Sequence, residues 1–297
     1  MAKTSEASIQ TSDISETSLS KQQAQVTHDD KIVERDCPSC GTDNSDEEIM
    51  AYSSPQWPMK KCKNCGLVYL EKAWSLDILY EKFAWEKSVE VENKRRNEIR
   101  GVERTISKKT RKRLGLFPRK NISNILAQYA QHGNVVDIGS GSGHYLLQLP
   151  EKFVPYGVEI STKLANTSKA AIQERGGDIV NKDALSGLKD FEDNFLTGIM
   201  MRSFLEHDIT PKETLIEAYR ALKSGGIVVI KVPNYAAVNR VIMGSKWCGF
   251  RFPEHVNYFT PKTLKDIIEK AGFEILRFNL TDKLPTGDNM WCIAVKR

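Results

Sequence analysis

Four of the six cysteines are arranged as two Cys-x-x-Cys pairs, Cys37-Pro-Ser-Cys40 and Cys62-Lys-Asn-Cys65, and a glycine follows each pair. A Cys-x-x-Cys turn lets both thiolates face one cation, and the glycine permits the tight backbone that the turn needs. Four sulfur ligands close a tetrahedral coordination sphere, so the metal is expected to be structural. We therefore predict a zinc site at these cysteines, with rubredoxin-like iron as the main alternative.

Disulfide and redox roles for the same cysteines fit the sequence less well. Stable disulfides are rare in cytoplasmic proteins, and a redox dithiol needs only one such pair. The 21 residues between Cys40 and Cys62 are slightly more than is usual for this pattern, and a β-hairpin with one pair at each end would accommodate them. The remaining cysteines, Cys248 and Cys292, are expected to be buried or partly buried thiols.

A glycine-rich segment, Asp137-Ile-Gly139-Ser-Gly141-Ser-Gly143, follows a predicted strand and is expected to open a helix. Glycines let the backbone approach a ligand closely, and a helix N-terminus presents free N–H groups. The dinucleotide pattern G-x-G-x-x-G would need a glycine at position 144, where the chain has His144. The spacing therefore predicts a ligand-cradling loop of the form acid-x-G-x-G-x-G.

Two acidic residues beyond this loop stand where a nucleoside could bind. Glu159, twenty residues after Gly139, ends the second predicted strand, and a carboxylate there can accept hydrogen bonds from both ribose hydroxyls. Asp183 follows the third predicted strand, where an acidic side chain could accept from the exocyclic amine of an adenine. An ordinary helix N-cap is the alternative role for Asp183, and a purely structural role is the weaker alternative for Glu159.

Alternating strands and helices must position these residues. After His132-Gly133 the apolar pattern predicts βαβ units, and therefore a parallel sheet, which ends in an antiparallel hairpin strand. A helix through Ile122 and Leu126 precedes them, and a hairpin connection over 285–289 joins the last two strands. The predicted strands span 134–138, 154–160, 178–180, 196–201, 227–232, 274–278 and 290–295, and the predicted helices span 161–174, 211–222 and 261–271.

At these residues the sequence resembles the class I S-adenosylmethionine-dependent methyltransferases, over a stretch from about Asn121 to Arg297. The resemblance implies an α/β fold with a seven-stranded, mostly parallel, doubly wound sheet of strand order 3-2-1-4-5-7-6. The later segments look like the subgroup that methylates small molecules, including sugars, and Cys65-Gly-Leu-Val-Tyr69 also recurs before such domains. The segments that carry the resemblance, besides the glycine loop, are Ile199–His207, Ala221–Gly226, Val232–Asn234, Trp247–Phe259 and Ala271–Phe273.

The resemblance also implies which residues hold S-adenosylmethionine. Asp137, Gly139 and Gly141 would line the methionine side together with Gly143, Glu159 would hold the ribose beside Ile160, and Asp183 with Ala184 would hold the adenine. Arg202 and Ser203, which follow the fourth strand, would flank the sulfonium. Arg202 departs from expectation, since it brings a cation near a positive sulfonium. Either its side chain points away or only its backbone contributes.

Methyl transfer from a sulfonium is an in-line displacement with an activated leaving group, so positioning of the nucleophile can supply much of the catalysis. A hydroxyl acceptor also needs a general base, and histidine titrates near neutrality. His255, in the loop after the fifth strand, is the preferred base, and His207, after the fourth strand, is the second candidate. The alternatives are loop ordering for His255 and capping or packing for His207.

Several other chemistries are disfavoured by the sequence. The fourth strand leads into Arg202-Ser-Phe rather than an Asp/Asn-Pro-Pro-Tyr segment for exocyclic base amines. A Pro-Cys nucleophile for cytosine carbon methylation and the carboxylate pair of magnesium-dependent catechol-type enzymes are not evident. The acceptor atom, whether oxygen, nitrogen or carbon, stays open.

Composition divides the chain into four parts. Residues 1–30 are polar and are expected to be a disordered tail. They are followed by a zinc-ribbon module over 31–72, a helical basic connector over 73–120 and the catalytic domain over 121–297. Between Glu86 and Lys120 there are 13 Lys or Arg against 5 Asp or Glu. This stretch is either a solvated helix face or a surface for phosphate-bearing partners.

The 297 residues, with 40% hydrophobic and 27% charged residues and a net charge of +5, describe a soluble chain. Neither a membrane-spanning run nor a secretory signal is visible, so we expect a cytoplasmic enzyme without membrane insertion. The leading interpretation is a methyltransferase for a small molecule, such as a sugar or a precursor of a polysaccharide or secondary metabolite. The alternatives are an RNA methyltransferase that grips phosphates through the zinc module and the connector, and a non-catalytic binding module. The oligomeric state stays open.

Overall fold

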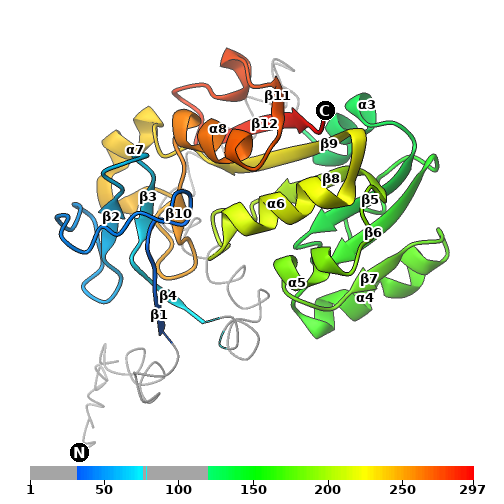
Figure 1. Cartoon of the computed structure of the whole chain (residues 1–297), viewed down its shortest axis with the longest axis horizontal. Coiled ribbons are helices and arrows are strands. Elements are labelled where there is room, and N and C mark those ends of the chain that lie inside the picture. Colours follow the sequence, from blue (N-terminus) through cyan, green and yellow to red (C-terminus); the bar gives the residue numbers. More distant parts are fainter. Residues whose placement is uncertain (1–31, 76–77, 79–119) are drawn as a thin grey trace, which may run out of the picture.

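The computed structural model describes residues 32–75, Ile78 and 120–297 (Figure 1). The predicted tail over 1–30 and most of the predicted connector over 73–120 lie outside these residues. The core of the fold is a seven-stranded sheet, ordered β11-β12-β9-β8-β5-β6-β7. Its strands are β5 (Gly133–Ile138), β6 (Phe153–Val158), β7 (Asp178–Val180), β8 (Leu196–Arg202), β9 (Leu222–Pro233), β11 (Glu274–Arg277) and β12 (Asn289–Val295).

The strand directions confirm the predicted class I architecture. Strands β7, β6, β5, β8 and β9 pair in parallel, and β12 pairs antiparallel with both β9 and β11. Numbered by order along the chain, this is the order 3-2-1-4-5-7-6 that the resemblance implied. The carboxyl ends of the five parallel strands therefore share one edge of the sheet, where ligands bind in such folds.

Helices cover both faces of the sheet, as alternation along the strands requires. In β5, Val136 packs into the cluster formed with α5 (Ala184–Lys189), α6 (Pro211–Ala221) and α8 (Pro261–Lys270). Its neighbour Val135 packs on the opposite face, against α3 (Ile122–Tyr129) and α4 (Thr162–Gln173). Figure 1 shows α6 and α8 lying across the strands of one face. Successive residues of a strand point to opposite faces, so apolar residues at both positions mark a strand buried on both sides.

The prediction of a helix after the glycine loop is wrong. Residues 144–149 form isolated turns, in which the Leu147 amide donates to the Gly143 carbonyl at 3.0 Å and the Leu149 amide donates to the Leu146 carbonyl at 3.1 Å. Pro150 follows immediately, and β6 begins at Phe153. The segment is therefore too short for a regular helix, although Leu146 and Leu149 still cover the sheet.

The last two strands also differ from the prediction in their connection. They pair antiparallel, but the link includes the 3-10 turn η2 (Leu280–Asp282) in addition to the predicted turn over 285–289. The buried carboxylate of Asp282 fixes this longer link, because it accepts hydrogen bonds from Arg277 and Lys120. The sequence pattern alone did not show that a carboxylate would be buried here.

The cysteine module, residues 32–74, packs directly on the part of the chain that contains the seven-stranded sheet. It contains two antiparallel pairs, β1 (Ile32–Glu34) with β4 (Lys72–Trp74) and β2 (Met59–Lys61) with β3 (Val68–Leu70). Strand β10 (Asn257–Tyr258), from the long connection after β9, adds to β3 as a third strand. The same connection contains α7 (Val238–Met243) and η1 (Gly244–Lys246). None of the helices in the described part of the chain combines the length and hydropathy that crossing a bilayer requires.

Candidate functional site

The glycine loop lies at the carboxyl end of β5, beside the end of β6. Gly139, Gly141 and Gly143 have φ values of 72°, 55° and 71°, which a residue with a side chain rarely adopts. The Gly139 amide donates to the Val158 carbonyl at 2.9 Å, which ties the loop to β6. A side-chain carbon at Gly141 would meet nothing within 4 Å, so the backbone there borders open space. The loop can therefore bring its backbone against a ligand.

Glu159 is buried at the end of β6, with 3% of its surface exposed. One carboxylate oxygen accepts from the Gly141 amide at 2.7 Å, and the other accepts from the Ser161 amide at 2.8 Å. Burial raises the pKa of the carboxyl, while these backbone bonds act in the opposite direction. Each oxygen keeps a second lone pair for a ligand hydroxyl. Glu159 therefore joins the glycine loop to the predicted ribose position.

Asp137, which is buried, and Arg202, which is exposed, lie at the ends of the neighbouring strands β5 and β8. Burial raises the pKa of Asp137 well above its ordinary value, and the guanidinium of Arg202 partly opposes that rise. The side chain of Arg202 lies over the ring of Tyr145, with 4.6 Å between guanidinium carbon and ring centroid. The structure thus places a cation–π contact where the sequence left the direction of Arg202 open.

Ser203 follows β8 with a left-handed φ of 54°, a strained conformation for a non-glycine residue. Its hydroxyl accepts from the ammonium of Lys231 at 2.7 Å, and its amide donates to the Lys231 carbonyl at 2.8 Å. Lys231 lies in β9 and was not singled out in the sequence. These two bonds hold the turn that leads from β8 toward the histidines.

The predicted adenine side is built from the ends of β6 and β7. Asp183 is the N-cap of α5 and accepts from the Ser186 amide at 2.9 Å, while Ala184 is the first residue of that helix. The side chain of Asn181 donates to the carbonyls of Glu159, at 2.8 Å, and Ile160, at 3.0 Å. Asn181 was missed, although an amide directly after a strand is a signal that could have identified it.

Two histidines meet at the same edge of the sheet. The Nδ1 of His207 lies 2.9 Å from the Glu254 carbonyl, and the Nδ1 of His255 lies 2.8 Å from the Gly249 carbonyl. A carbonyl only accepts, so each Nδ1 carries the proton and each Nε2 keeps a lone pair. The rings are perpendicular, with centroids 4.6 Å apart. The structure therefore brings together the two bases that the sequence proposed.

Burial keeps both imidazoles neutral. It lowers the pKa of His207 to about 3 and the pKa of His255 well below its ordinary value, and the positive charge of Arg251 acts in the same direction. Arg251 itself is paired with the carboxylate of Glu254. Both histidines are thus neutral at pH 7, and the same lowering of the pKa makes each a weaker base than a free imidazole.

Glu206 completes this cluster and was missed as a functional residue, although it stands next to His207 in a segment that carries the resemblance. Only 1% of its surface is exposed, and its carboxylate and the two imidazoles offer ligand atoms that all lie within 4.8 Å of one another. Its Oε2 atom has no hydrogen-bond partner among the described residues. Burial raises the pKa of this carboxyl to about 7, and Lys231 is the strongest opposing charge.

The surroundings of this cluster favour a proton over a metal. Two histidines and one glutamate are a known zinc ligand set. However, the charges of Lys231, Arg251 and Arg202 all oppose the rise of the Glu206 pKa, so cations already lie close to this carboxylate. A further divalent cation would be repelled, whereas a proton on Glu206 would satisfy one of the converging lone pairs.

Glu206 should make the free energy of unfolding depend on pH. The folded state holds its proton up to a pKa of about 7, whereas the ordinary value is 4.5. Between these values the folded state binds more protons than the unfolded state, so this group makes stability fall as pH rises from about 4.5 to about 7. In Glu206→Gln, urea unfolding should show a less negative slope over this range than wild type. Equal slopes would contradict the buried acid.

The four cysteines of the predicted metal site converge in the structure. All are free thiols, and their sulfur atoms lie within 4.8 Å of one another. The Sγ atoms of Cys37 and Cys65 are 3.5 Å apart, as are those of Cys40 and Cys62. The glycines after each pair, Gly41 and Gly66, have φ values of 68° and 76°. Four thiols around one centre fit a tetrahedral metal ion, and Cys248 and Cys292 are partly buried and buried, as predicted.

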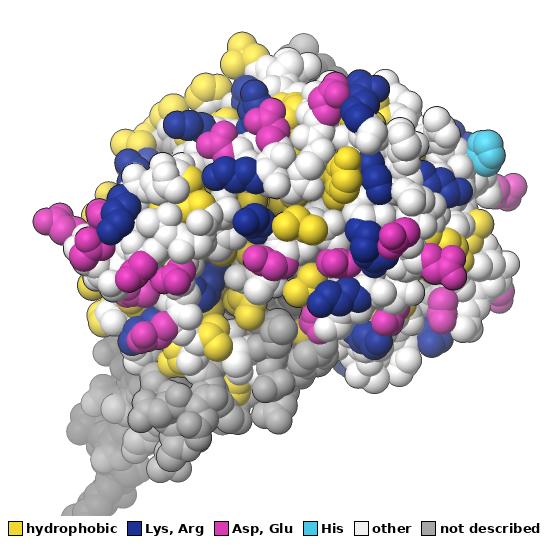
Figure 2. Space-filling view, in the orientation of Figure 1, with side chains coloured by type: hydrophobic (Ala, Val, Ile, Leu, Met, Phe, Trp, Pro, Cys, Tyr) yellow, Lys and Arg dark blue, Asp and Glu magenta, His cyan; other side chains and the backbone are white. Residues whose placement is uncertain are grey.

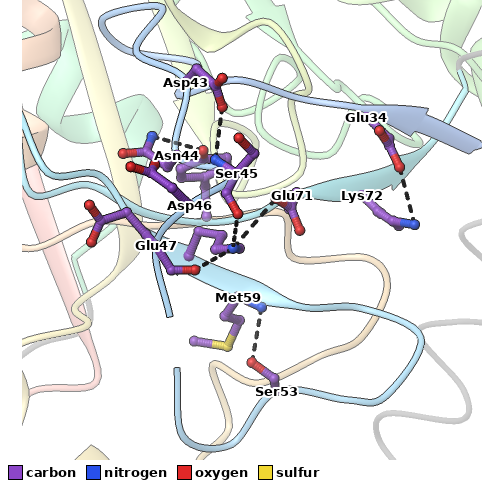
Figure 3. A network of polar contacts seen from close by, with 12 residues as sticks. Glu34, Asp43, Asn44, Ser45, Asp46, Glu47, Ser53, Met59, Glu71 and Lys72 are labelled. Carbon is purple, nitrogen blue, oxygen red and sulfur yellow. Dashed lines mark hydrogen bonds and ion pairs between the residues drawn. The ribbon is translucent and has the colours of Figure 1, made fainter. Parts of the chain in front are cut away.

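A buried lysine braces the segment between the two cysteine pairs. The ammonium of Lys60 donates to the carbonyls of Ser45 and Glu47 and lies 3.7 Å from the carboxylate of Glu71. Figure 3 shows these three partners converging beside β2. Lys60 is only 4% exposed, so its charge is compensated inside the module. This network gives the 21-residue segment a defined path without a regular hairpin.

Comparison with protein families gives a match to the part of the chain that forms most of the sheet. A family model described as a methyltransferase domain matches residues 109–277, more than half of the chain. An uncharacterized protein of Methanocaldococcus jannaschii is 25% identical over 157 residues, which are 52% of this chain and 72% of the relative.

Solved structures add two similar proteins. An S-adenosylmethionine-dependent methyltransferase from Clostridium acetobutylicum is 11% identical, with 65% of this chain and 98% of that chain covered and a TM-score of 0.49. A methyltransferase of the same cofactor dependence from Methanosarcina mazei is 23% identical, with 61% and 98% covered and a TM-score of 0.44. The assignment of the chain to a family rests on the family model and not on these structures.

Proposed function

Because the chain belongs to the methyltransferase domain family, we propose that its S-adenosylmethionine-dependent activity is directed at a small-molecule acceptor. A sugar or another precursor of a polysaccharide or secondary metabolite is the candidate class. The observation that carries the proposal is the placement of two neutral histidines, the half-buried His207 after β8 and the buried His255 after β9, the strands that continue the sheet beside β5. The charge of Arg202 acts on both the glycine-loop side and the histidine side of this edge, because it opposes the rise of the pKa of Asp137 and of Glu206.

The residues fit the cofactor that the family uses. When bound, S-adenosylmethionine supplies an activated methyl group. Glu159 would accept hydrogen bonds from the ribose hydroxyls, and the backbone of the glycine loop would contact the methionine side. Asp183 with Ala184, Ile160 and Asn181 would border the adenine, and Ser203 would lie near the sulfonium. These roles rest on the open space at Gly141 and the lone pairs left on Glu159.

On the acceptor side, the chain must remove a proton if the nucleophile is a hydroxyl group. His255 is held by its Nδ1 bond to Gly249, which leaves Nε2 as the atom that could accept a proton, and the ring lies close to His207 and Glu206. Proton transfer to His255 Nε2 would activate the acceptor, and Glu206, in its ionised form, would stabilise the imidazolium that forms. The alternative, that His255 only orders its loop, is tested below.

An RNA acceptor is the second candidate, because of the charge of the connector in the sequence. Most of that connector lies outside the described residues. On the face that Figure 2 shows, basic and acidic side chains of the described residues are interspersed. A phosphate-gripping surface needs clustered basic residues, so the face in that view favours the small acceptor.

Labelled cofactor decides between the two acceptor classes. The protein is incubated with S-adenosylmethionine carrying a labelled methyl group, together with either a small-metabolite extract or total RNA from the same cells. Label in the metabolite pool is the expected result. Label only in RNA, with transfer that falls steeply as salt is raised, would replace the proposal by the RNA methyltransferase.

We also propose that the four cysteines bind one structural zinc ion. Elemental analysis of protein purified without chelator should find about one zinc per chain, because structural zinc supplies much of the folding free energy of such modules. Cys62→Ser should lose the metal, whereas Cys248→Ser, outside the cluster, should keep it. Iron in the wild type, or equal zinc in both variants, would contradict this assignment.

A further inference from the structure

We propose that Arg35 of the cysteine module is a positioning residue for the acceptor side, acting through Asn257 on His255, His207 and Glu206. Metal loading at the four cysteines then governs the geometry of the histidines without governing cofactor binding. The inference rests on the proposed function for its meaning, but its contacts and its test stand apart from the identity of the acceptor.

Asn257 is the centre of this arrangement, and only 2% of its surface is exposed. Its side-chain oxygen accepts from the Arg35 guanidinium at 2.8 Å. Its side-chain nitrogen donates to the carbonyls of Leu205, at 2.8 Å, and Asp208, at 2.6 Å. Both the oxygen and the nitrogen of the side-chain amide are therefore hydrogen-bonded. A buried amide with all these partners in place has one orientation.

The two carbonyls that Asn257 holds lie on either side of Glu206 and His207. The carbonyl of Glu206 accepts from the backbone amides of Val256, at 2.8 Å, and Asn257, at 3.1 Å. His255 stands two residues before Asn257 on the other segment. These bonds therefore set the spacing between the turn after β8 and the loop after β9, which carry the converging imidazoles.

The cysteine module holds the other side of the same segment. Strand β3 begins three residues after Cys65, and the Leu70 amide donates to the Val256 carbonyl at 2.9 Å. Tyr69 pairs with Asn257 in the β3–β10 register. Arg35 stands two residues before Cys37, so both chain segments that contact Asn257 and Val256 emerge directly from metal-binding turns. The position of these segments thus depends on the four cysteines being held together.

The cofactor side is built differently. The bonds to the Glu159 carboxylate come from Gly141 and Ser161, and Asn181 bonds the Glu159 carbonyl, all within the sheet's own loops. Loss of the Arg35 contact should therefore change the histidines and leave cofactor affinity nearly unchanged. This separation distinguishes positioning from general destabilisation.

The test follows the imidazoles directly and needs no acceptor. In 15N-labelled wild type, long-range 1H–15N correlation spectra should show His207 and His255 as neutral tautomers protonated at Nδ1, with signals assigned from His207→Asn and His255→Asn. Arg35→Met, which keeps the aliphatic stem, should shift or broaden both signals. Zinc content should stay at wild-type level, and the Kd for S-adenosylmethionine should stay within about twofold. Arg35→Lys should recover part of the wild-type spectrum, because an ammonium can still donate to Asn257.

Arg297→Met is the matched control, since Arg297 pairs with Glu274 at the surface and should leave the imidazole signals unchanged. Unchanged His207 and His255 signals in Arg35→Met would overturn the proposal, and so would cofactor affinity that falls in parallel with them. If Arg35→Met does not fold, zinc is removed from wild type with a chelator. Imidazole signals that change while the cofactor still binds would support the proposal, and signals that persist would overturn it. Failure of the wild type to bind S-adenosylmethionine would count against the proposed function alone, because the imidazole comparison is made without cofactor.

Discussion

Glu159→Ala should weaken the binding of S-adenosylmethionine at least ~30-fold, which corresponds to about 2 kcal/mol for the loss of a charged hydrogen-bond acceptor. The carboxylate is buried and already fixed by the amides of Gly141 and Ser161, so a ribose would meet an acceptor that needs no further ordering. Removing the carboxylate also leaves the Gly141 amide without this acceptor, which adds to the loss of binding free energy. Isothermal titration calorimetry on wild type and variant measures the difference.

Two further variants make this result specific. Glu151→Ala removes an exposed glutamate and should leave the affinity unchanged. Glu159→Gln keeps the shape of the side chain but replaces one acceptor by a donor, so its affinity should fall between wild type and Glu159→Ala. Unchanged affinity in a folded Glu159→Ala protein would remove Glu159 from the cofactor site.

Replacing His255 should lower turnover at least ~100-fold, the lower end of what a general base contributes. His255→Ala removes the base, and His255→Asn is the sharper variant. The asparagine amide can still donate to the Gly249 carbonyl, as Nδ1 does now, but it has no basic nitrogen in place of Nε2. Both variants should be slow with the metabolite fraction that accepts label, and both should bind the cofactor as wild type does.

The asparagine variant separates catalysis from loop ordering. If His255 only holds its loop, His255→Asn keeps that bond and should work within a few-fold of wild type. His144→Ala is the matched control, since His144 is exposed and, within the described residues, its ring bonds the nearby Gln148 side chain. An active His255→Asn enzyme would transfer the role of base to His207 or Glu206.

Local patterns in the sequence predicted most of the sheet. The strands from β5 to β9 and the helices α4, α6 and α8 were located because their apolar residues repeat with a clear period and end at glycine or at a capping residue. The predicted β9 was too short, since the strand continues from Leu222 through Gly225-Gly226, where the helix stop was expected. The strand order came from the resemblance, not from periodicity.

What the sequence could not predict depends on contacts between distant segments. Strand β10 is only two residues long, and it pairs with β3 across almost two hundred positions of sequence, so no local period could reveal it. The burial of Glu206 beside two histidines likewise results from the meeting of two loops. The turns after Gly143 fail to become a helix because Pro150 and β6 leave too little chain, which is a matter of length and not of propensity.

A crystal structure of the protein with S-adenosylhomocysteine would test most directly whether the cofactor binds at this edge of the sheet with its sulfur toward the two histidines. We predict that both ribose hydroxyls bond the Glu159 carboxylate, that the homocysteine lies along Gly139 and Gly141, and that the sulfur faces His255 and His207. A ribose bound away from Glu159, or a sulfur directed away from both histidines, would contradict the account.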